Sequence, residues 1–410
     1  MPKKDRIIFH CDNNAFYASV EESLYPELKK VPMAVCGDPE SRRGIILAKN
    51  ELAKAKGVKT TETIWQAQLK CPDLVRRPAR HHLYREFCEK INDIYQQYSP
   101  QVERGGIDES FIEMTGCLRP FDEDVLKAAN EIRQRIYSEI GVSISVGISW
   151  NKIFAKLASD TAPSNAMQMI SRENYRQLVW AKPVSALLMV GEVTRDQLHV
   201  LNIRTIGELA HTDVNILTYK LDSMGEILWK YANGLDDDPV RYASDHEPPK
   251  SIGNSRTFKR NLISQDDVST ALTAICDMVA ARLRNSNLKC NSVQITIKDD
   301  RLKSITRQKG TSMPSWLATE LFNESLTLIK ASWREGKPIR MLTVTAQKLT
   351  PADQSPEQLS LFESEQEARE RQERLEAAVD TIRNKYGPGS ISHASLMKND
   401  LGLDEVDDPE

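Results

Sequence analysis

Three carboxylates stand where predicted strands end, and their types suit metal-assisted chemistry. Asp12 follows an apolar run at residues 6–11 that predicts a buried strand. Asn13 and Asn14 then occupy the start of a predicted helix. A carboxylate at the rim of a sheet can meet a metal ion. Taken alone, Asp12 is equally well explained as a helix cap.

The other two carboxylates, Asp108 and Glu109, lie in residues 101–116, where the mixture of apolar and acidic residues is typical of a half-buried strand. Gly105 and Gly106 precede them and predict a tight turn with positive φ. Adjacent strand residues point to opposite faces, so the two acids can share a site only where this turn breaks the pleat.

Three carboxylates from two strand ends would form an oxygen-lined site. Mg²⁺ suits such a site because it takes a few carboxylates and fills its other positions with water and phosphate. Two such ions can activate an attacking oxygen and stabilise a leaving group in nucleotidyl transfer. The sequence therefore predicts two-metal chemistry if folding brings Asp12, Asp108 and Glu109 together.

Length and composition set limits on the elements that hold these acids. A chain of 410 residues predicts roughly two to four domains. No apolar run approaches the ~20 residues of a membrane span, and residues 1–9 do not resemble a signal peptide, so we expect a cytoplasmic protein without membrane contact. Seven scattered cysteines without a CxxC pair indicate reduced thiols rather than disulfides or zinc ligands.

Charge is distributed unevenly along the chain. The formal net charge is −3, but residues 250–350 hold 17 Lys and Arg against 8 Asp and Glu, and residues 351–410 hold 6 against 15. The basic segment can follow the phosphates of a nucleic acid, and the acidic tail masks it in the total. A solvated basic face is the simpler alternative.

The order of predicted elements indicates an α+β protein. Residues 1–171 combine strands, helices and the antiparallel acidic hairpin, without a GxGxxG or Walker loop. Several basic residues beside the loop at residues 37–44 can meet a triphosphate, although such side chains are often only solvated: Arg42, Arg43, Lys49, Lys54 and Lys56.

The remaining chain divides into four predicted segments. Residues 172–240 are helical and contain turns that allow a DNA-gripping helix-hairpin-helix or an ordinary helical hairpin. A Pro-containing linker, 241–252, leads to a small basic α/β layer, 253–350. Residues 351–410 form an acidic, partly helical tail, in which QLSLF has the appearance of a docking peptide, with a strand edge as the alternative.

Seven motifs in one order resemble the Y-family translesion DNA polymerases, close to bacterial DNA polymerase IV of the Gram-positive type. They span residues 6–362: DNNAFYASVE, ILAKN with AKAKGVKT, GIDESFIEMTG, SVGISWNKIFAKLASD, the helical hairpin, KSIGNSRTFKR and QLSLF. The resemblance implies a right-hand architecture. Palm and fingers would occupy residues 1–171, a thumb 172–240 and a DNA-binding little finger 253–350.

The resemblance also implies roles for single residues. Asp12, Asp108 and Glu109 match the metal-binding carboxylates, with Glu109 the catalytic acid and the Asn13 main chain a further ligand. Tyr17 matches the steric gate against ribonucleotides, although without the acids it would be interpreted as a core aromatic. Two more residues complete the substrate set: Phe16 and Lys54.

The implied cofactor is a pair of Mg²⁺ ions, with Mn²⁺ as an alternative. The implied partners are primer-template DNA, a dNTP and the sliding clamp (β subunit), and we expect a monomer. The clamp would bind the peptide formed by Gln358, Leu359, Ser360, Leu361 and Phe362. Such tethering raises the local concentration at a primer terminus.

Some positions depart from the family pattern around the triphosphate. Glu51 and Lys54 stand where a tyrosine and an arginine are usual, and Pro163 stands where a lysine is usual. Thr61 and Met189 each replace a common glycine. Because Glu51 repels phosphate and Lys lacks the bidentate fork of Arg, we expect weaker nucleotide affinity than in a typical relative.

The expected activity is template-directed, low-fidelity addition of dNTPs to a primer 3′-OH across damaged DNA, without proofreading. Two alternatives remain at this stage. A clamp-tethered DNA-binding homologue with weakened or lost catalysis would share the fold, and Glu51 and Pro163 favour it. A nucleotide cyclase could share the acidic hairpin, but the basic segment and QLSLF argue against it.

Overall fold

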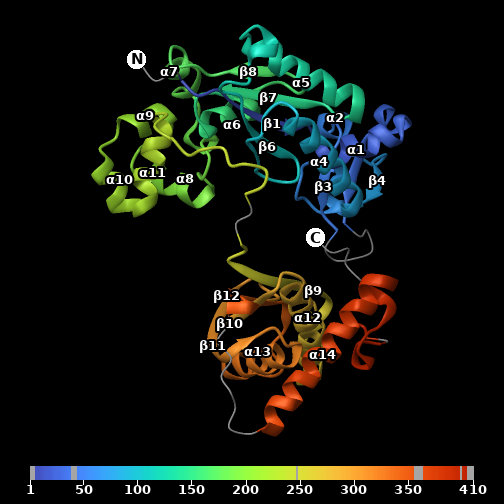
Figure 1. The fold of residues 1–410 in the computed structure, drawn as a ribbon. Coiled ribbons are helices and arrows are strands. Elements are labelled where there is room, and N and C mark those ends of the chain that lie inside the picture. Colours follow the sequence, from blue (N-terminus) through green and yellow to red (C-terminus); the bar gives the residue numbers. More distant parts are fainter. Residues whose placement is uncertain (1–4, 38–43, 246–247, 355–362, 398, 404–410) are drawn as a thin grey trace. The chain divides into compact units, whose positions relative to one another are not determined.

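The computed structural model describes residues 5–37, 44–245, 248–354, 363–397 and 399–403 (Figure 1). The chain forms two compact units, Met1–His246 and Glu247–Pro409, which we describe separately. Both units combine helices with mainly antiparallel sheets, so the predicted α+β class is confirmed. None of the described helices has both the length and the apolar character that crossing a bilayer requires.

A five-stranded sheet lies at the centre of the first unit. Its strand order is β5-β6-β1-β7-β8. The bounds are β5 Val102–Arg104, β6 Glu109–Glu113, β1 Ile8–Asn13, β7 Ile144–Ser149 and β8 Met167–Met169. β1 pairs antiparallel with both β6 and β7, so it is enclosed on both sides. This central position explains why five of the six residues of β1 are buried.

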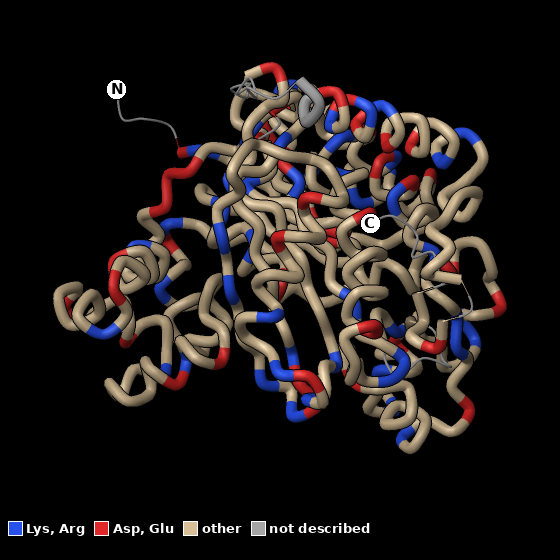
Figure 2. The backbone as a smooth tube through the Cα atoms, turned by 90° about the horizontal axis from the view of Figure 1, so that it is seen from below, with Lys and Arg blue, Asp and Glu red and all other residues tan. Residues whose placement is uncertain are grey.

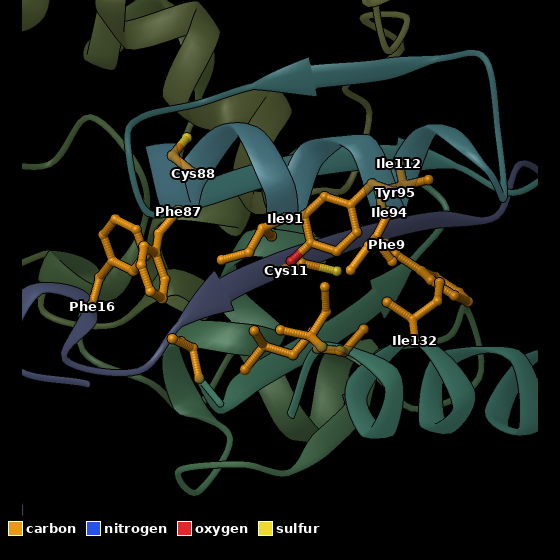
Figure 3. Packing of buried hydrophobic residues seen from close by; sticks show 14 of the residues in the cluster. Phe9, Cys11, Phe16, Phe87, Cys88, Ile91, Ile94, Tyr95, Ile112 and Ile132 are labelled. Carbon is orange, nitrogen blue, oxygen red and sulfur yellow. The ribbon is translucent and has the colours of Figure 1, made fainter. Parts of the chain in front are cut away.

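The two faces of the central sheet pack against different helices. Phe9 and Cys11 of β1 lie in one core with Ile91 and Tyr95 of α4 (His81–Gln96), as Figure 3 shows, and α5 (Val125–Ile140) completes this layer. Residues at alternating positions of β1 face α6 (Lys152–Thr161) instead, because side-chain direction alternates along a strand.

α6 approaches β7 very closely at Gly147. A Cβ atom there would lie 2.0 Å from the Ala155 carbonyl oxygen and 2.3 Å from the Ser159 nitrogen. Only glycine therefore allows this helix to lie directly on the sheet. The close approach fixes the side chains that α6 presents to β1, Lys156 among them.

A smaller sheet, of order β3-β2-β4, forms a separate layer with its own core. Its strands are β2 Met33–Cys36, β3 Ile46–Lys49 and β4 Val75–Pro78, and its helices are α1 Phe16–Leu24, α2 Glu51–Ala55 and α3 Ile64–Lys70. Asn50, between β3 and α2, also joins α2 to β2, because its Oδ1 accepts hydrogen bonds from the Met33 and Ala53 nitrogens, each at 3.0 Å.

The first unit ends in five short helices. They are α7 Tyr175–Val179, α8 Glu192–Val200, α9 Ile206–His211, α10 Val214–Leu221 and α11 Ser223–Ala232. α8 and α9 flank the turn expected at residues 202–203, where Asn202 has a φ of 59°. Met189 precedes α8 with a φ of 71°. The helical hairpin is therefore present, and its grip on DNA stays a prediction.

The second unit contains a four-stranded antiparallel sheet of order β11-β10-β12-β9, with two helices packed on it. The bounds are β9 Ser251–Leu262, α12 Gln265–Asn285, β10 Leu288–Asp299, β11 Ser304–Ser315, α13 Ala318–Ser332 and β12 Ile339–Pro351. Apolar residues alternate clearly along only the two inner strands, β10 and β12, so their sequences by themselves indicate strands. The edge strands escaped because β11 is almost wholly exposed and β9 is mostly polar, so neither carries strong apolar alternation.

The acidic tail packs against this second unit. α14 (Glu363–Tyr386) contributes Glu376 and Asp380 to ion pairs with Arg284 of α12. Three leucines beyond α14 are buried in the same hydrophobic cluster as the sheet: Leu396, Leu401 and Leu403. Figure 2 marks the charged residues along the backbone. The excess charge of the tail is thus partly matched by basic residues of the layer that it covers.

Candidate active site

The end of β1 meets the acidic hairpin. In the antiparallel ladder Asp12 is directly opposite Glu109, and it is opposite Ser145 on the other side. Residues paired in this way have Cα atoms about 4.5–5.5 Å apart. Asp108 precedes β6 by one residue. The three predicted carboxylates therefore come from neighbouring backbone positions at one end of the central sheet.

Asn13 connects the two strands at this point. Its backbone nitrogen and its side-chain Nδ2 both donate to the Asp108 carbonyl oxygen, each at 2.8 Å. The Asn13 Oδ1 atom is buried and has no hydrogen-bond partner among the described residues. A buried acceptor without a partner is costly, so this oxygen is available to a ligand that enters the site.

The glycines before the acids act differently from the prediction. Neither Gly105 nor Gly106 has a positive φ, although both nitrogens donate to the Glu109 carbonyl oxygen. A Cβ atom at Gly105 would lie 3.0 Å from Glu109 Oε1, and one at Gly106 would lie 3.3 Å from Asp108 Oδ1. The pair leaves room for the carboxylates, which would have to shift by a few tenths of an ångström if either glycine carried a side chain.

Asp12 and Asp108 form no ion pair with a described residue, and burial outweighs the favourable charge of Lys156 on both. Burial and the charge of Asp108 raise the pKa of Asp12 to about 7. The pKa of Asp108 is also raised, chiefly by burial and further by Glu109. Each shift reports that the ionised form is disfavoured by lost hydration and by like charge. A bound divalent cation would relieve both costs.

Glu109 is in the opposite electrostatic situation. His10 and Lys156 hold the pKa of Glu109 at about 2, because Oε2 lies 3.4 Å from His10 Nε2 and 2.5 Å from Lys156 Nζ. The His10 ring is oriented from behind by Ser159 Oγ, 2.6 Å from Nδ1. Glu109 is therefore a stable carboxylate that is already paired with the Lys156 cation and lies beside the buried His10 ring.

The site fits divalent cations only after a small rearrangement. Within the described residues, no three His, Cys, Asp or Glu side chains lie together ready to hold a metal ion. The donor set itself is suitable, since the carboxylates of Asp12 and Asp108 and the oxygens of Asn13, both side-chain Oδ1 and main-chain carbonyl, are hard ligands. For Glu109 to join them, its carboxylate must turn away from Lys156.

A cavity of about 420 Å³ opens beside these acids. It is lined by residues of β1, the helix that follows, β3 and two loops: Asp12, Asn13, Ala15, Phe16, Tyr17, Leu47, Ala48, Lys49, Thr60, Ile107 and Asp108. Phe16 is buried, whereas Tyr17 is half-buried. The Tyr17 ring stacks on Tyr84 with ring centroids 4.2 Å apart, which holds it at the cavity wall.

Comparison with known proteins agrees with this geometry. Residues 11–160 match the model of the impB/mucB/samB family, and residues 249–361 match the model of the C-terminal domain of that family. DNA polymerase IV of Acetivibrio thermocellus is 41% identical over 98% of this chain and 100% of its own length. DNA polymerase IV of Clostridium kluyveri is 34% identical over 96% and 98%.

This chain belongs to the impB/mucB/samB family.

A solved structure supports the same fold. A Y-family DNA polymerase chimera of Dbh and Dpo4 superposes with a TM-score of 0.74 at 20% identity, covering 84% of this chain and 99% of the chimera. The recognition of a Y-family polymerase close to DNA polymerase IV is thus confirmed, together with the multidomain polymerase fold. The expected enzyme class, a DNA-directed DNA polymerase, is confirmed as well.

The positions that depart from the family pattern have clear local structures. Thr61 and Met189, which replace glycines, both have a φ of 71°, a conformation that favours glycine. The Pro163 carbonyl accepts a hydrogen bond from Ser145 Oγ at 3.1 Å. Its side chain has no positive charge that could bind a phosphate. Lys54 Nζ lies 3.1 Å from Glu51 Oε1, and neither residue lines the cavity.

The proposed clamp peptide, residues 358–362, lies outside the described residues.

The environment of Glu109, which depends on His10 and Lys156, was not predicted from the sequence. The sequence does place Lys156 among polar neighbours near the sheet. It lies three residues before Ser159 and four before Asp160, on a helix that directly follows a buried strand. Lys49 was predicted only as one of several basic residues that can meet a triphosphate, and not as the one that lines the cavity.

Proposed function

We propose that the chain adds dNTPs to a primer 3′-OH on a damaged template, with divalent ions held by Asp12, Asp108, Glu109 and the Asn13 main chain. The observation that carries this proposal is that Asp12 and Asp108 line one wall of a 420 Å³ cavity, with Glu109 directly opposite Asp12 in the ladder. Family membership supplies the class of reaction, and the cavity supplies a place for the incoming nucleotide.

The bound ions would supply activation of the 3′-OH and stabilisation of the pyrophosphate leaving group. The protein contributes the position of the charges. Asp12 and Asp108 repel one another, so together they favour a divalent cation over an empty site. Glu109 stays ionised near neutral pH because its pKa is about 2, and it is the catalytic acid of the proposal. We propose Mg²⁺ as the usual ion and Mn²⁺ as an alternative.

Tyr17 is proposed as the steric gate that excludes ribonucleotides. Its stacking on Tyr84 limits its movement, and the Tyr84 hydroxyl donates to Glu21 Oε1 at 2.9 Å. A rigid ring at the wall of a nucleotide cavity would collide with a 2′-OH, whereas a mobile one would yield. Phe16, buried behind the same wall, supports this arrangement.

The remaining elements of the proposal concern partners and place of action. Low-fidelity synthesis without proofreading, binding of the sliding clamp through residues 358–362, a monomeric state and a cytoplasmic location follow from the family resemblance. Residues 253–350 are proposed as the DNA-binding little finger and 172–240 as the thumb. Lys54 stays in the proposed substrate set, although its ion pair with Glu51 must open for it to reach a phosphate.

Primer extension by the wild type and by Asp108→Ala tests this function. We expect extension by the wild type and a loss of at least about 100-fold in the variant, the order of magnitude for removing one electrostatic contact to a transition state. Asp122→Ala is the matched control, because Asp122 is an exposed acid outside the cavity.

Two other outcomes would contradict the proposal. Equal absence of extension in the wild type and Asp108→Ala would indicate a DNA-binding homologue without catalysis. Nucleotide turnover that does not depend on a primer-template would indicate a cyclase-like enzyme. Replacing Tyr17 by Ala tests the gate separately, since a correct assignment predicts increased use of ribonucleotides relative to dNTPs.

A further inference from the structure

A polyphosphate in the cavity requires cations, and the cavity wall offers few. Among the described lining residues, Lys49 is the only Lys or Arg, whereas Asp12 and Asp108 contribute negative charge. Two other lysines of this region are engaged elsewhere. Lys54 pairs with Glu51, and Lys56 pairs with Asp73 at 2.7 Å.

Lys49 is positioned by regular structure. It is the last residue of β3 and is opposite Ala34 in the antiparallel pair with β2. Its Nζ donates to Thr60 Oγ1 at 3.0 Å, and both residues line the cavity. Lys49 forms no ion pair with any described residue, and the charges of Glu51 and Glu62 act on its ammonium only from a distance.

Thr60 is held in place by the backbone that surrounds it. The Thr61 nitrogen donates to the Ile46 carbonyl oxygen at 2.8 Å, and the Ile46 nitrogen donates to the Glu62 carbonyl oxygen at 2.9 Å. These bonds connect the loop to the start of β3. Thr61 keeps its unfavourable φ of 71° in this arrangement. Lys49 and Thr60 therefore face the cavity as a preorganised pair.

Burial of the Lys49 ammonium, together with the nearby charge of Lys54, lowers the pKa of Lys49. A cation under this strain gains from an anionic ligand, because the ligand restores the favourable electrostatics that burial removed. The Thr60 hydroxyl accepts from Lys49 and keeps its own hydrogen, which it can donate to a phosphate oxygen.

We propose that Lys49, oriented by Thr60, binds the phosphates of the incoming nucleotide. The inference rests on the proposed function and changes one expectation drawn from the sequence. The principal phosphate cation would come from the end of β3 rather than from Lys54 on α2.

The test compares Lys49→Gln with Lys59→Gln and Lys54→Gln. Lys59 is exposed on the same loop as Thr60 and does not line the cavity, so its replacement removes the same charge without removing the contact. Pre-steady-state titration should show a dNTP Kd raised roughly tenfold or more in Lys49→Gln, as expected for loss of a charge-assisted hydrogen bond. The maximal rate should change much less, and Lys49→Arg should recover part of the affinity.

Pyrophosphate provides a second readout that involves neither sugar nor base. Its inhibition constant should rise in parallel with the dNTP Kd in Lys49→Gln, and Thr60→Val should give a smaller rise of both. An unchanged Kd in Lys49→Gln, or a larger increase in Lys54→Gln, would overturn the inference. A Kd increase without weaker pyrophosphate inhibition would also contradict it, since the contact would then not be to phosphate.

The design separates this inference from the proposed function. If the wild type extends no primer, the proposed function fails, and binding of pyrophosphate with Mn²⁺ to the wild type and Lys49→Gln is measured by calorimetry instead. Weaker binding in Lys49→Gln would still support the phosphate contact, and equal binding would refute it. Circular dichroism of each variant shows whether the fold is retained.

Discussion

Two groups of partly buried acids in this protein lie in opposite electrostatic surroundings. At the end of β1, Asp12 and Asp108 lie near each other, and the pKa of each is raised. On α14, Glu376 and Asp380 both pair with Arg284, whose Nε lies 2.6 Å from Asp380 Oδ2. Glu376 also accepts from the Ala318 nitrogen at the start of α13.

The difference shows which charges serve the fold. Arg284 and its acids satisfy one another, so they connect the tail to the second unit without any ligand. Asp12 and Asp108 oppose one another, which costs stability and is reasonable only where an external cation enters. Acids without an ion pair beside a cavity thus indicate the proposed functional site, whereas paired acids mark a structural joint.

Replacing Arg284 by Met should have the largest effect on stability. The change leaves Glu376 and Asp380 with 9% and 12% exposed side chains and no cation. Removing one partner of such a buried pair costs about 3–5 kcal/mol. Chemical denaturation followed by circular dichroism should show this loss in the second unit.

The matched control for this change is Arg374→Met. Arg374 lies on α14 with Glu376 and Asp380, is 73% exposed, and lies 3.8 Å from Glu370. We therefore expect its replacement to change the free energy of unfolding by no more than about 0.5 kcal/mol. Equal effects of the two replacements would show that the buried cluster does not anchor the tail, and the comparison would fail.

The affinity of the acid site for Mn²⁺ should fall as the pH is lowered. Asp12 has a pKa of about 7, so protons compete with the metal below that pH. Between pH 8 and pH 6 the ionised fraction falls about tenfold, and the Mn²⁺ affinity measured by electron paramagnetic resonance should follow. Asp12→Asn should bind weakly with little change over this range. A wild-type affinity independent of pH would contradict the unmatched state of Asp12.

Replacing Lys156 by Met should strengthen Mn²⁺ binding. Lys156 engages Glu109 and places positive charge where the ions would enter. One unit charge about 4 Å away in water is worth about 1 kcal/mol, or roughly fivefold in affinity. The same resonance titration measures the effect. Weaker binding in Lys156→Met would mean that the lysine holds Glu109 in the orientation that binds metal, rather than competing with the metal.

Replacing Asp12 by Asn should slightly stabilise the first unit. The folded-state pKa of Asp12 is raised above its unfolded value, so stability is lost as pH rises from about 4 toward 7 and is not regained above it. Asparagine removes this cost, and we expect a gain of about 0.5–1 kcal/mol at pH 8 and a smaller one at pH 5. Thermal unfolding at both pH values measures it. A destabilised variant at pH 8 would show that Asp12 is matched within the fold after all.

Some features followed from local patterns and others did not. The buried strand β1 and the ending of α5 at Gly141 with a φ of 80° follow from apolar runs and glycine, because both signals are local. The edge strands β9 and β11 did not, because β11 is exposed along most of its length and β9 is mostly polar, so neither shows apolar alternation. The docking of α14 also escaped prediction, since charged residues pair across almost a hundred positions.

The sequence by itself determined the family, the α+β class and the identity of the acids, because motif order and residue type are written in the chain. Only the tertiary structure decided that Asp12 is paired opposite Glu109 and that Lys156 forms an ion pair with Glu109. It also decided that Lys49 rather than Lys54 lines the cavity. Strand register and helix packing set these relations, and both depend on contacts between residues far apart in the chain.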